Sequence, residues 1–515
     1  MIKSSRSILL ICLLSLFQTH CVFRSFTGTT TGPAAPADGY VTLGKIPFKE
    51  AWYGMYFQDD KVGYSHFKID PSGENFAISS DSMMRLTTLK KTKEIVMKER
   101  VMVRPDLTMI SFDSRVRMEG KNLKMVGAPR GDKFVVDINV DGETLTREFP
   151  LQNKLYHSCA ISLMPALRGL REGNTYSFNV FNAEKQGIMP VEQMVSAVKG
   201  PTGPNGAVWR IRNSYGKSII NAWLDRRGLT VLEKALDGSL ITMLEDRESA
   251  ESFLKKKSRG KDLILDFSRI RVAKAIPNPE KVRFLKVRMR GIEPGLIAQD
   301  HRQRVRTEAT DEKGSGFDVF VHAEDPSTYD RPAPRKDSWG SALASFSGRE
   351  SLSDPVSDEY LAPTWSIQSD HKEIVEQARK IVSPRDKPLE KVTKLVGWTA
   401  QNIKNKMTDS FTALSVLRNR EGECQSHSGL YVALARSQKI PTRQVTGIVY
   451  TREIGFLYHA WAESYIDRWI AVDPTLNQVP ADATHIKITG GKHEDEVESL
   501  LKMVGKVKME VLEFQ

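Results

Sequence analysis

The sequence predicts an α+β protein in which a large, mainly antiparallel β region precedes a C-terminal domain of helices and strands. Three observations lead to this prediction. Short alternating runs separated by turn residues extend over residues 47–324. A stretch rich in Pro, Ser, Gly and Asp covers residues 325–365 and predicts a linker. Residues 366–515 combine helical periodicity with three extended runs, which predicts a separate domain.

The composition is that of a folded protein with more than one domain. The chain has 515 residues, of which 40% are hydrophobic and 27% are charged. Its net charge of +12 arises from 75 basic and 63 acidic residues spread over a long chain, so the charge does not predict nucleic-acid binding. Basic stretches at residues 255–261 and 283–290 alternate with apolar residues, which favours the solvent face of a sheet over an anion site.

The N-terminus predicts export. Lys3 and Arg6 precede the apolar run ILLICLLSLF, which is too short to span a bilayer and is typical of a cleaved signal peptide over residues 1–20. Residues 21–46 follow as a Gly/Thr/Pro/Ala-rich tether. We therefore expect an exported protein of the periplasm or cell envelope.

Cys21 is a candidate lipidation site. The segment resembles a bacterial lipoprotein signal, in which the cysteine just past the apolar run receives the lipid. Gln18, Thr19 and His20 depart from that pattern, because small residues usually precede the cysteine. A membrane anchor through the N-terminal lipid and plain secretion, which leaves Cys21 without a role, therefore both remain open.

The four cysteines do not form a disulfide framework. They stand at positions 12, 21, 159 and 424, and signal cleavage removes the first. Cys159 lies in the apolar stretch CAISLM, where a small buried hydrophobe is the expected role. We expect Cys159 and Cys424 to stay apart.

The β region begins with recognisable hairpins. The runs AWYGMYF and VGYSHFKI flank a polar turn at residues 58–61. A second hairpin joins Phe134–Val140 to Glu143–Phe149 through Asp141-Gly142, a dipeptide that accepts the positive φ of a two-residue turn. The region contains no internal repeat and no cluster with metal-ligand spacing, so it does not indicate a chemistry.

Two amphipathic helices are expected after the linker. Asp370 and Glu373 form a capping-box pattern, and Ile374, Ala378 and Ile381 then fall on one helical face. A second helical pattern starts near Leu389, with Pro388 tolerated in its first turn. Both helices would pack on the core of the C-terminal domain.

Cys424 is the candidate nucleophile. Gly422 and Glu423 lead into it, and the next dozen residues, with Leu430 and Leu434 on one face, predict a buried helix. Cys424 should therefore lie near a helix N-terminus, where unpaired amides and the positive end of the dipole favour the reactive thiolate.

Three extended runs after this helix orient two further candidates: Gln444–Tyr450, Phe456–Tyr465 and Trp469–Asp473. Alternation puts His459 on one face of the second run and Asp473 on one face of the third. For these two to lie directly opposite each other, the turn must centre on Ile466, which implies an odd-numbered loop or a bulge. A tight turn at Asp467-Arg468 would separate them.

These motifs together resemble the transglutaminase-like superfamily. The resemblance rests on GEC with His427 three residues later, KIPTRQVTG, HAW with Glu463, and WIAVDPT. It covers Glu421–Thr475 clearly and the helical lead-in from Asp370 more weakly, about a quarter of the chain. It implies a papain-like core in which a helix bearing the nucleophile packs on an antiparallel sheet.

The resemblance also implies a mechanism. Cys424 would be the nucleophile, His459 would exchange its proton, and Asp473 would orient the imidazole. The backbone amide of Cys424 would supply one oxyanion donor, with Gln401, Trp398 and Gln425 as candidates for the second. A thiol-dependent acyl transfer on peptide or protein amides follows, either hydrolytic, as in a protease or amidase, or crosslinking. No metal or cofactor is expected.

Other interpretations remain at this stage. Taken singly, Cys424 fits a buried apolar cysteine, His459 an ordinary strand residue and Asp473 the Asp of an Asp-Pro turn. His427 fits packing against the helix, and a zinc site of Cys424, His427 and His459 would lack a fourth ligand. The rival from another class is a non-catalytic envelope binding or scaffold protein with a degenerate papain-like domain.

Overall fold

The structure is a computed structural model. It describes residues 34–515 except 58–59, 89–90, 119–120, 141, 183–186, 200–202, 216–217, 236–237, 256–268, 312–313, 326–357, 407–411, 453, 491–502 and 504–505. The predicted signal peptide, Cys21, the first part of the tether and most of the predicted linker lie outside the described residues. The chain divides into two compact units on either side of residue 264. Each unit is described by itself.

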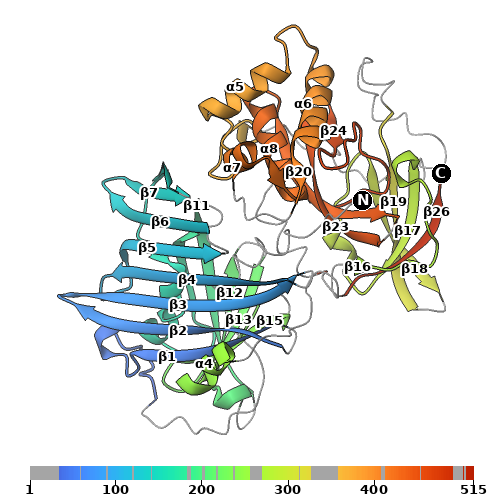
Figure 1. The fold of residues 1–515 in the computed structure, drawn as a ribbon. Coiled ribbons are helices and arrows are strands. Elements are labelled where there is room, and N and C mark those ends of the chain that lie inside the picture. Colours follow the sequence, from blue (N-terminus) through green and yellow to red (C-terminus); the bar gives the residue numbers. More distant parts are fainter. Residues whose placement is uncertain are drawn as a thin grey trace. The chain divides into compact units, whose positions relative to one another are not determined.

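The N-terminal unit is built on one 15-stranded sheet (Figure 1), which confirms the large β region. The strand order is β8-β7-β6-β5-β4-β3-β2-β1-β15-β14-β13-β12-β11-β10-β9, and all neighbours are antiparallel except the parallel pair β9 and β10. The strands are β1 (Glu50–Phe57), β2 (Asp60–Ser72), β3 (Asn75–Thr88), β4 (Lys91–Val103), β5 (Met109–Met118), β6 (Lys121–Arg130), β7 (Lys133–Val140), β8 (Glu143–Pro150), β9 (Leu155–His157), β10 (Thr175–Asn182), β11 (Gly187–Ala197), β12 (Trp209–Tyr215), β13 (Ser218–Leu224), β14 (Thr230–Ala235) and β15 (Leu240–Glu245).

Short turns produce most of this sheet, because hairpin neighbours in sequence become neighbours in space. Both predicted hairpins are confirmed as β1–β2 and β7–β8. In the second, Val140 pairs with Glu143 across a two-residue turn, and Gly142 has a φ of 98°, which residues with a Cβ rarely adopt.

The sheet curls around two short helices, α2 (Ser158–Ile161) and α3 (Met164–Arg168). Helix α2 contacts β3 and also β10, although these strands are far apart in the strand order, and β5 contacts β9. The two arms of the sheet therefore face each other, and α2 lies between them. Helix α4 (Arg247–Lys255) packs against β1 and β2.

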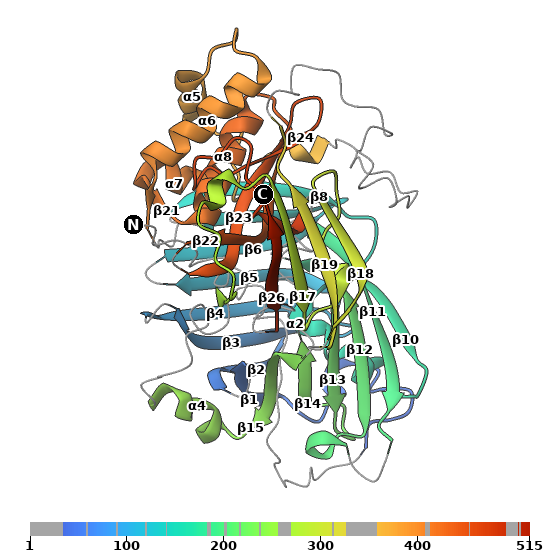
Figure 2. The same cartoon turned by 90° about the vertical axis from the view of Figure 1, so that its right-hand side faces the viewer.

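Among the described residues, the C-terminal unit combines helices with three sheets. The largest has the order β16-β23-β22-β25, with β24 also paired to β23, the second has the order β18-β19-β17-β26, and the third is the parallel pair β20-β21. In Figure 2, β26 lies beside β17, followed by β19 and β18. The elements are β16 (Arg269–Ile270), β17 (Phe284–Arg290), β18 (Gln303–Asp311), β19 (Gly314–His322), α5 (Lys372–Ile381), α6 (Pro388–Asn402), β20 (Lys404–Asn405), α7 (Ala413–Asn419), β21 (Glu421–Gly422), α8 (Cys424–Ser437), β22 (Thr442–Thr451), β23 (Gly455–Tyr465), β24 (Trp469–Val472), β25 (Ile486–Gly490) and β26 (Lys508–Phe514).

The helices form where their sequence patterns predict them, with one correction at a cap. Helix α5 is capped by His371 and not by Asp370, since the His371 ring accepts a hydrogen bond from the Glu373 amide at 3.3 Å. Pro388 occupies the first turn of α6, where its missing N–H costs nothing. The apolar faces of α5 and α6 pack with α8 in one buried core.

Strand pairing assigns part of the predicted β region to the C-terminal unit. Strands β16 to β19 fall within residues 47–324, but β16 pairs with β23 and β17 pairs with β26. The sequence pattern shows that a strand forms, but it does not show which distant strand will pair with it. Among the described residues, no helix combines the length and the apolar character needed to cross a bilayer.

Candidate active site

Helix α8 holds Cys424 at its first residue, which confirms the expected position at a helix N-terminus. The approach is tightly fixed, because the Lys406 amide donates to the Gly422 carbonyl at 3.0 Å. A side chain at position 422 would clash with Ser426, since its Cβ would lie 2.3 Å from the Ser426 Cβ. The chain can therefore turn into α8 this closely only with a glycine at this position.

Strands β23 and β24 bring His459 and Asp473 together, but in a different register from the expected one. Tyr465 pairs with Trp469, so the turn centres on Asp467 and not on Ile466. The loop is odd-numbered, as expected, and Asp467 has a φ of 71°. When the centre of the turn moves by one residue, each residue of β23 pairs with a residue of β24 two positions further along. A shift of two positions leaves every side chain on the same face of the sheet. His459 therefore still reaches Asp473, from a diagonal position.

The Asp473 carboxylate is saturated with hydrogen bonds. Oδ2 accepts from His459 Nε2 at 2.6 Å and from His485 Nε2 at 3.0 Å. Oδ1 accepts from the backbone amides of Thr475 at 2.7 Å and Leu476 at 3.0 Å. These donors hold the carboxylate in one orientation and stabilise its charged form.

Electrostatics favour a charged Asp473 and a charged His459. Burial by itself would raise the pKa of Asp473, but the charge of His459 and its hydrogen bond hold that pKa well below its usual range. Burial would likewise lower the pKa of His459, but the charges of Asp473 and Cys424 outweigh it and raise the pKa to about 10. The site is therefore built to hold an imidazolium.

The remaining nitrogen of His459 is the one available to Cys424. Since Nε2 donates to Asp473, Nδ1 carries the lone pair in the neutral ring. Nδ1 is buried and, among the described residues, has no partner that meets strict hydrogen-bonding geometry, while the Cys424 side chain lies close enough to raise the pKa of the ring. Nδ1 is therefore the ring nitrogen that can exchange a proton with the Cys424 thiol.

The three candidate residues are deeply buried. Cys424 and Asp473 are 0% exposed and His459 is 1% exposed. The Trp461 ring, also fully buried, stacks on His459 with a centroid distance of 6.3 Å. A substrate can reach the thiol only if the structure opens locally.

His427 serves packing. Its Nδ1 faces the Glu423 carbonyl at 2.9 Å and its Nε2 faces the Ile403 carbonyl at 3.0 Å. Burial lowers the pKa of His427 and so favours the neutral ring, which donates only one of these contacts at a time. The residue thus connects α8 to the end of α6. Both of its ring nitrogens contact carbonyl oxygens, so the ring does not point at a metal site with Cys424 and His459.

His485 is a site residue that the sequence interpretation missed. It immediately precedes β25, and its Nδ1 lies 3.2 Å from Oδ1 of Asp482 while its Nε2 binds Asp473. Burial would lower the pKa of His485, but Asp482 and Asp473 together raise it. His485 therefore bridges two carboxylates. The only available signal was a histidine shortly after Asp473, and its partner could not be inferred without the pairing of β25 with β22.

Glu463 belongs to a buried ion-pair network beside the site. Its carboxylate contacts Arg443 Nε at 2.8 Å and Lys487 Nζ at 3.0 Å, and Lys487 also contacts Asp300 at 2.8 Å. Glu463 is 1% exposed. The network joins β22, β23 and β25 to the loop before β18, so it sets the register on which the site depends.

Replacing Glu463 by glutamine is expected to destabilise the C-terminal unit by about 3 kcal/mol, because two buried cations lose a charged partner. Thermal unfolding with limited proteolysis to identify the affected unit would measure this. The matched control is Glu280→Gln, which removes an exposed pair with Arg452 and should cost about 1 kcal/mol or less. Equal effects of the two variants would contradict a structural role for the network.

Comparison with known proteins finds a family match for one segment. Residues 375–474 match the family model of the transglutaminase-like superfamily. The search of curated proteins found no match.

Three solved structures show distant likeness. A candidate cysteine protease from Cytophaga hutchinsonii is 15% identical, with 45% of this chain and 86% of that chain covered and a TM-score of 0.27. A beta-barrel-like protein of a domain of unknown function from Brucella abortus is 13% identical, with 38% of this chain and 95% of that chain covered and a TM-score of 0.29. A Pseudomonas aeruginosa protein is 11% identical, with 41% of this chain and 95% of that chain covered and a TM-score of 0.21. At these scores the likenesses carry no argument about activity.

Proposed function

We propose that the chain is a thiol-dependent acyl-transfer enzyme that acts on peptide or protein amide bonds, with a papain-like arrangement of Cys424, His459 and Asp473. The observation that carries the proposal is the state of His459. Its Nε2 is committed to Asp473 while its Nδ1 is left for the neighbouring thiol at the start of α8. A nucleophile, a base and an orienting acid in this order are what acyl transfer through a thiol requires.

The chemistry follows from these positions. Nδ1 of His459 takes the Cys424 proton, and the sulfur forms a bond to the amide carbonyl carbon. When the C–N bond breaks, the imidazolium returns the proton to the leaving amine, and the acyl group stays on sulfur. Asp473 stabilises the imidazolium throughout. We assign one oxyanion donor to the backbone amide of Cys424 at the start of α8. Of the candidates for the second donor, Gln401 is exposed and the Trp398 ring is covered by Arg420, so Gln425 remains.

The acyl acceptor defines two versions of this function. Water would regenerate the thiol and release a carboxylic acid, as in a protease or amidase, and a lysine amine would form an isopeptide crosslink. We favour hydrolysis, in the bacterial cell envelope that the N-terminal sequence indicates. Incubation with a peptide thioester, with and without added lysine amine, separates the two by the mass of the product.

The complete burial of Cys424 favours a second candidate function, a non-catalytic scaffold that keeps the fold and not the activity. In that case the thiol would be an inert core residue. Reactivity of Cys424 towards a small alkylating reagent distinguishes the two candidates.

The test is the pH dependence of iodoacetamide alkylation at Cys424, located by peptide mass spectrometry. Wild type should react readily at pH 6, because His459 holds the proton. In His459→Gln, the rate at pH 6 should fall at least tenfold and should rise only in the ordinary thiol range, about pH 8.5. Cys424→Ala assigns the signal, and His66→Gln, a change in the other unit, should leave the profile unaltered. An unreactive Cys424, or the same profile in both proteins, would support the scaffold instead.

A further inference from the structure

The interior of the curled sheet contains a cavity of about 100 Å³ that the proposed chemistry does not use. Polar side chains line much of it, although it lies within the N-terminal unit; among them are Ser65, Ser80, Glu99, Gln193, Asn213 and Thr230. Empty cavities in a protein core are lined by apolar side chains, whereas cavities with polar linings hold water or a ligand. The polar lining therefore fits a cavity that holds water or a ligand.

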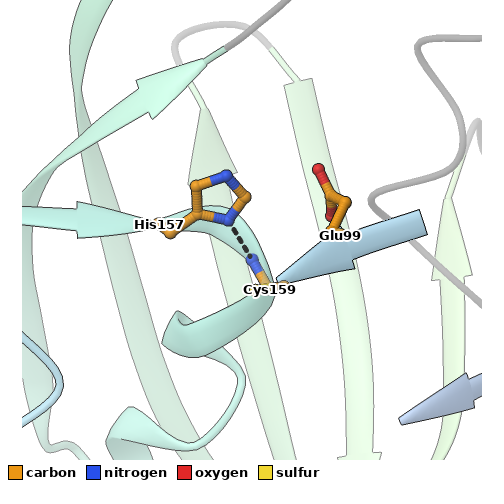
Figure 3. A group of neighbouring side chains, drawn as sticks. All are labelled: Glu99, His157 and Cys159. Carbon is orange, nitrogen blue, oxygen red and sulfur yellow. Dashed lines mark hydrogen bonds between the residues drawn. The ribbon is translucent and has the colours of Figure 1, made fainter. Parts of the chain in front are cut away.

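Three potential metal ligands lie close together (Figure 3), and two of them line this cavity. Glu99 comes from β4, His157 ends β9, and Cys159 lies in the first turn of α2. One ligand atom from each lies within 4.8 Å of the other two. Glu99 and Cys159 line the cavity, and Glu99 and His157 are buried. Segments distant in sequence thus converge on one point.

The His157 ring is prepared to coordinate. It is 0% exposed, and its Nε2 has no hydrogen-bond partner among the described residues. Its Nδ1 accepts a long hydrogen bond of 3.4 Å from the Cys159 amide, drawn as the dashed line in Figure 3, so Nδ1 carries the lone pair of the neutral ring and would exchange this contact for a metal. Burial lowers the pKa of His157 to about 4, so the ring is neutral at physiological pH. A neutral imidazole is the form that binds metals.

We propose that Glu99, His157 and Cys159 bind one zinc-type divalent cation, whose remaining coordination position opens towards the cavity. Thiolate, imidazole and carboxylate are the ligands that zinc takes, and three protein ligands with an open position are a recurrent zinc arrangement. Calcium and magnesium prefer oxygen ligands alone. On binding, the Cys159 thiol releases its proton to solvent as the metal–sulfur bond forms.

The alternative of a second thiol nucleophile fits this group poorly. Burial and the charge of Glu99 raise the pKa of the Cys159 thiol, which opposes the thiolate that a nucleophile needs. A bound cation reverses that effect because its charge stabilises the thiolate. The same carboxylate that hinders a nucleophile therefore helps a metal site.

The experiment is titration of the chelator-treated full chain with Co²⁺, in a Cys424→Ala background that removes the thiol of the other unit. We expect one Co²⁺ per chain with a sulfur-to-cobalt charge-transfer band, displaced by Zn²⁺. Cys159→Ser should abolish the band, and His157→Gln and Glu99→Gln should weaken binding by about a hundredfold or more. The matched control is His66→Gln, a histidine of the same unit outside the cluster, which should bind as the parent does.

A second measurement needs no variant in the cluster. Zn²⁺ should protect Cys159 from iodoacetamide in the wild-type chain, as read by peptide mass spectrometry. A folded chain that shows neither the band nor the protection overturns the proposal, as does a band that persists in Cys159→Ser. Cobalt bound without any sulfur band would point instead to His459, Asp473 and His485, whose ligand atoms also lie within 4.8 Å of one another, and would overturn the proposal too.

Discussion

Replacing Cys424 by alanine is expected to lower the rate of acyl transfer by on the order of 10⁴–10⁶-fold, because the covalent route through sulfur is lost. The readout is hydrolysis of a p-nitrophenyl ester together with the intact mass of the chain, in which an acyl adduct should appear on Cys424 in wild type. His459→Ala should cost nearly as much, since the two residues act as one unit. The double variant should therefore be scarcely slower than either single one.

A control on the same helix separates chemistry from folding. Gly429→Ala adds a Cβ that meets no atom of the described residues within 4 Å, so it should retain wild-type turnover. Persistence of ester hydrolysis and of the acyl adduct in Cys424→Ala would show that another residue carries the reaction. Persistence of hydrolysis without an adduct would show that the ester reacts elsewhere on the surface.

Replacing Asp473 by asparagine is expected to lower turnover by on the order of 10³–10⁴-fold while leaving the fold largely intact. The variant keeps an oxygen for the Thr475 and Leu476 amides but loses the charge that stabilises the His459 imidazolium. The pKa of His459 is raised to about 10, so the imidazolium persists up to about pH 10 in wild type. In the variant, the alkaline edge of turnover should fall towards the ordinary histidine range, about pH 6.5, because the imidazolium that returns the proton to the leaving amine is lost at lower pH.

Two matched variants sharpen this result. Asp467→Asn, in the exposed loop between β23 and β24, suits a position of positive φ and should leave turnover unchanged. His485→Gln should shift the same alkaline edge by a smaller amount, because His485 touches Asp473 and not the reacting atoms. An unchanged pH profile in Asp473→Asn would remove this carboxylate from the proposed mechanism.

The pKa shifts also predict how the stability of the C-terminal unit changes with pH. The folded-state pKa of Asp473 and that of Asp482 lie below their unfolded values, so the stabilisation that they contribute is present above about pH 4 and is lost as the pH falls. The pKa of His485 is raised, so its contribution is present below about pH 6.5 and is lost as the pH rises through its folded value. The stability of the C-terminal unit thus depends on the charged carboxylates of Asp473 and Asp482 and on the charged ring of His485.

Local patterns were sufficient to predict most of the elements that carry the candidate site. Helix α8 with Cys424 at its start, strands β22 to β24 and the shared face of His459 and Asp473 follow from periodicity, because the residues that determine them are neighbours in the chain. The hairpin at Gly142 follows for the same reason. Each of these features depends on side-chain spacing within a few residues.

Long-range pairing decided the rest. The turn at Asp467, the bridge of His485 between Asp473 and Asp482, and the pairing of β17 with β26 depend on partners brought together only by folding. The convergence of Glu99 with His157 and Cys159 likewise required the sheet to curl around α2. Sequence spacing thus determined Cys424, His459 and Asp473 as candidates. The tertiary structure alone decided the tautomer of His459, the burial of the thiol and the second carboxylate behind Asp473, because each depends on atoms far away in the chain.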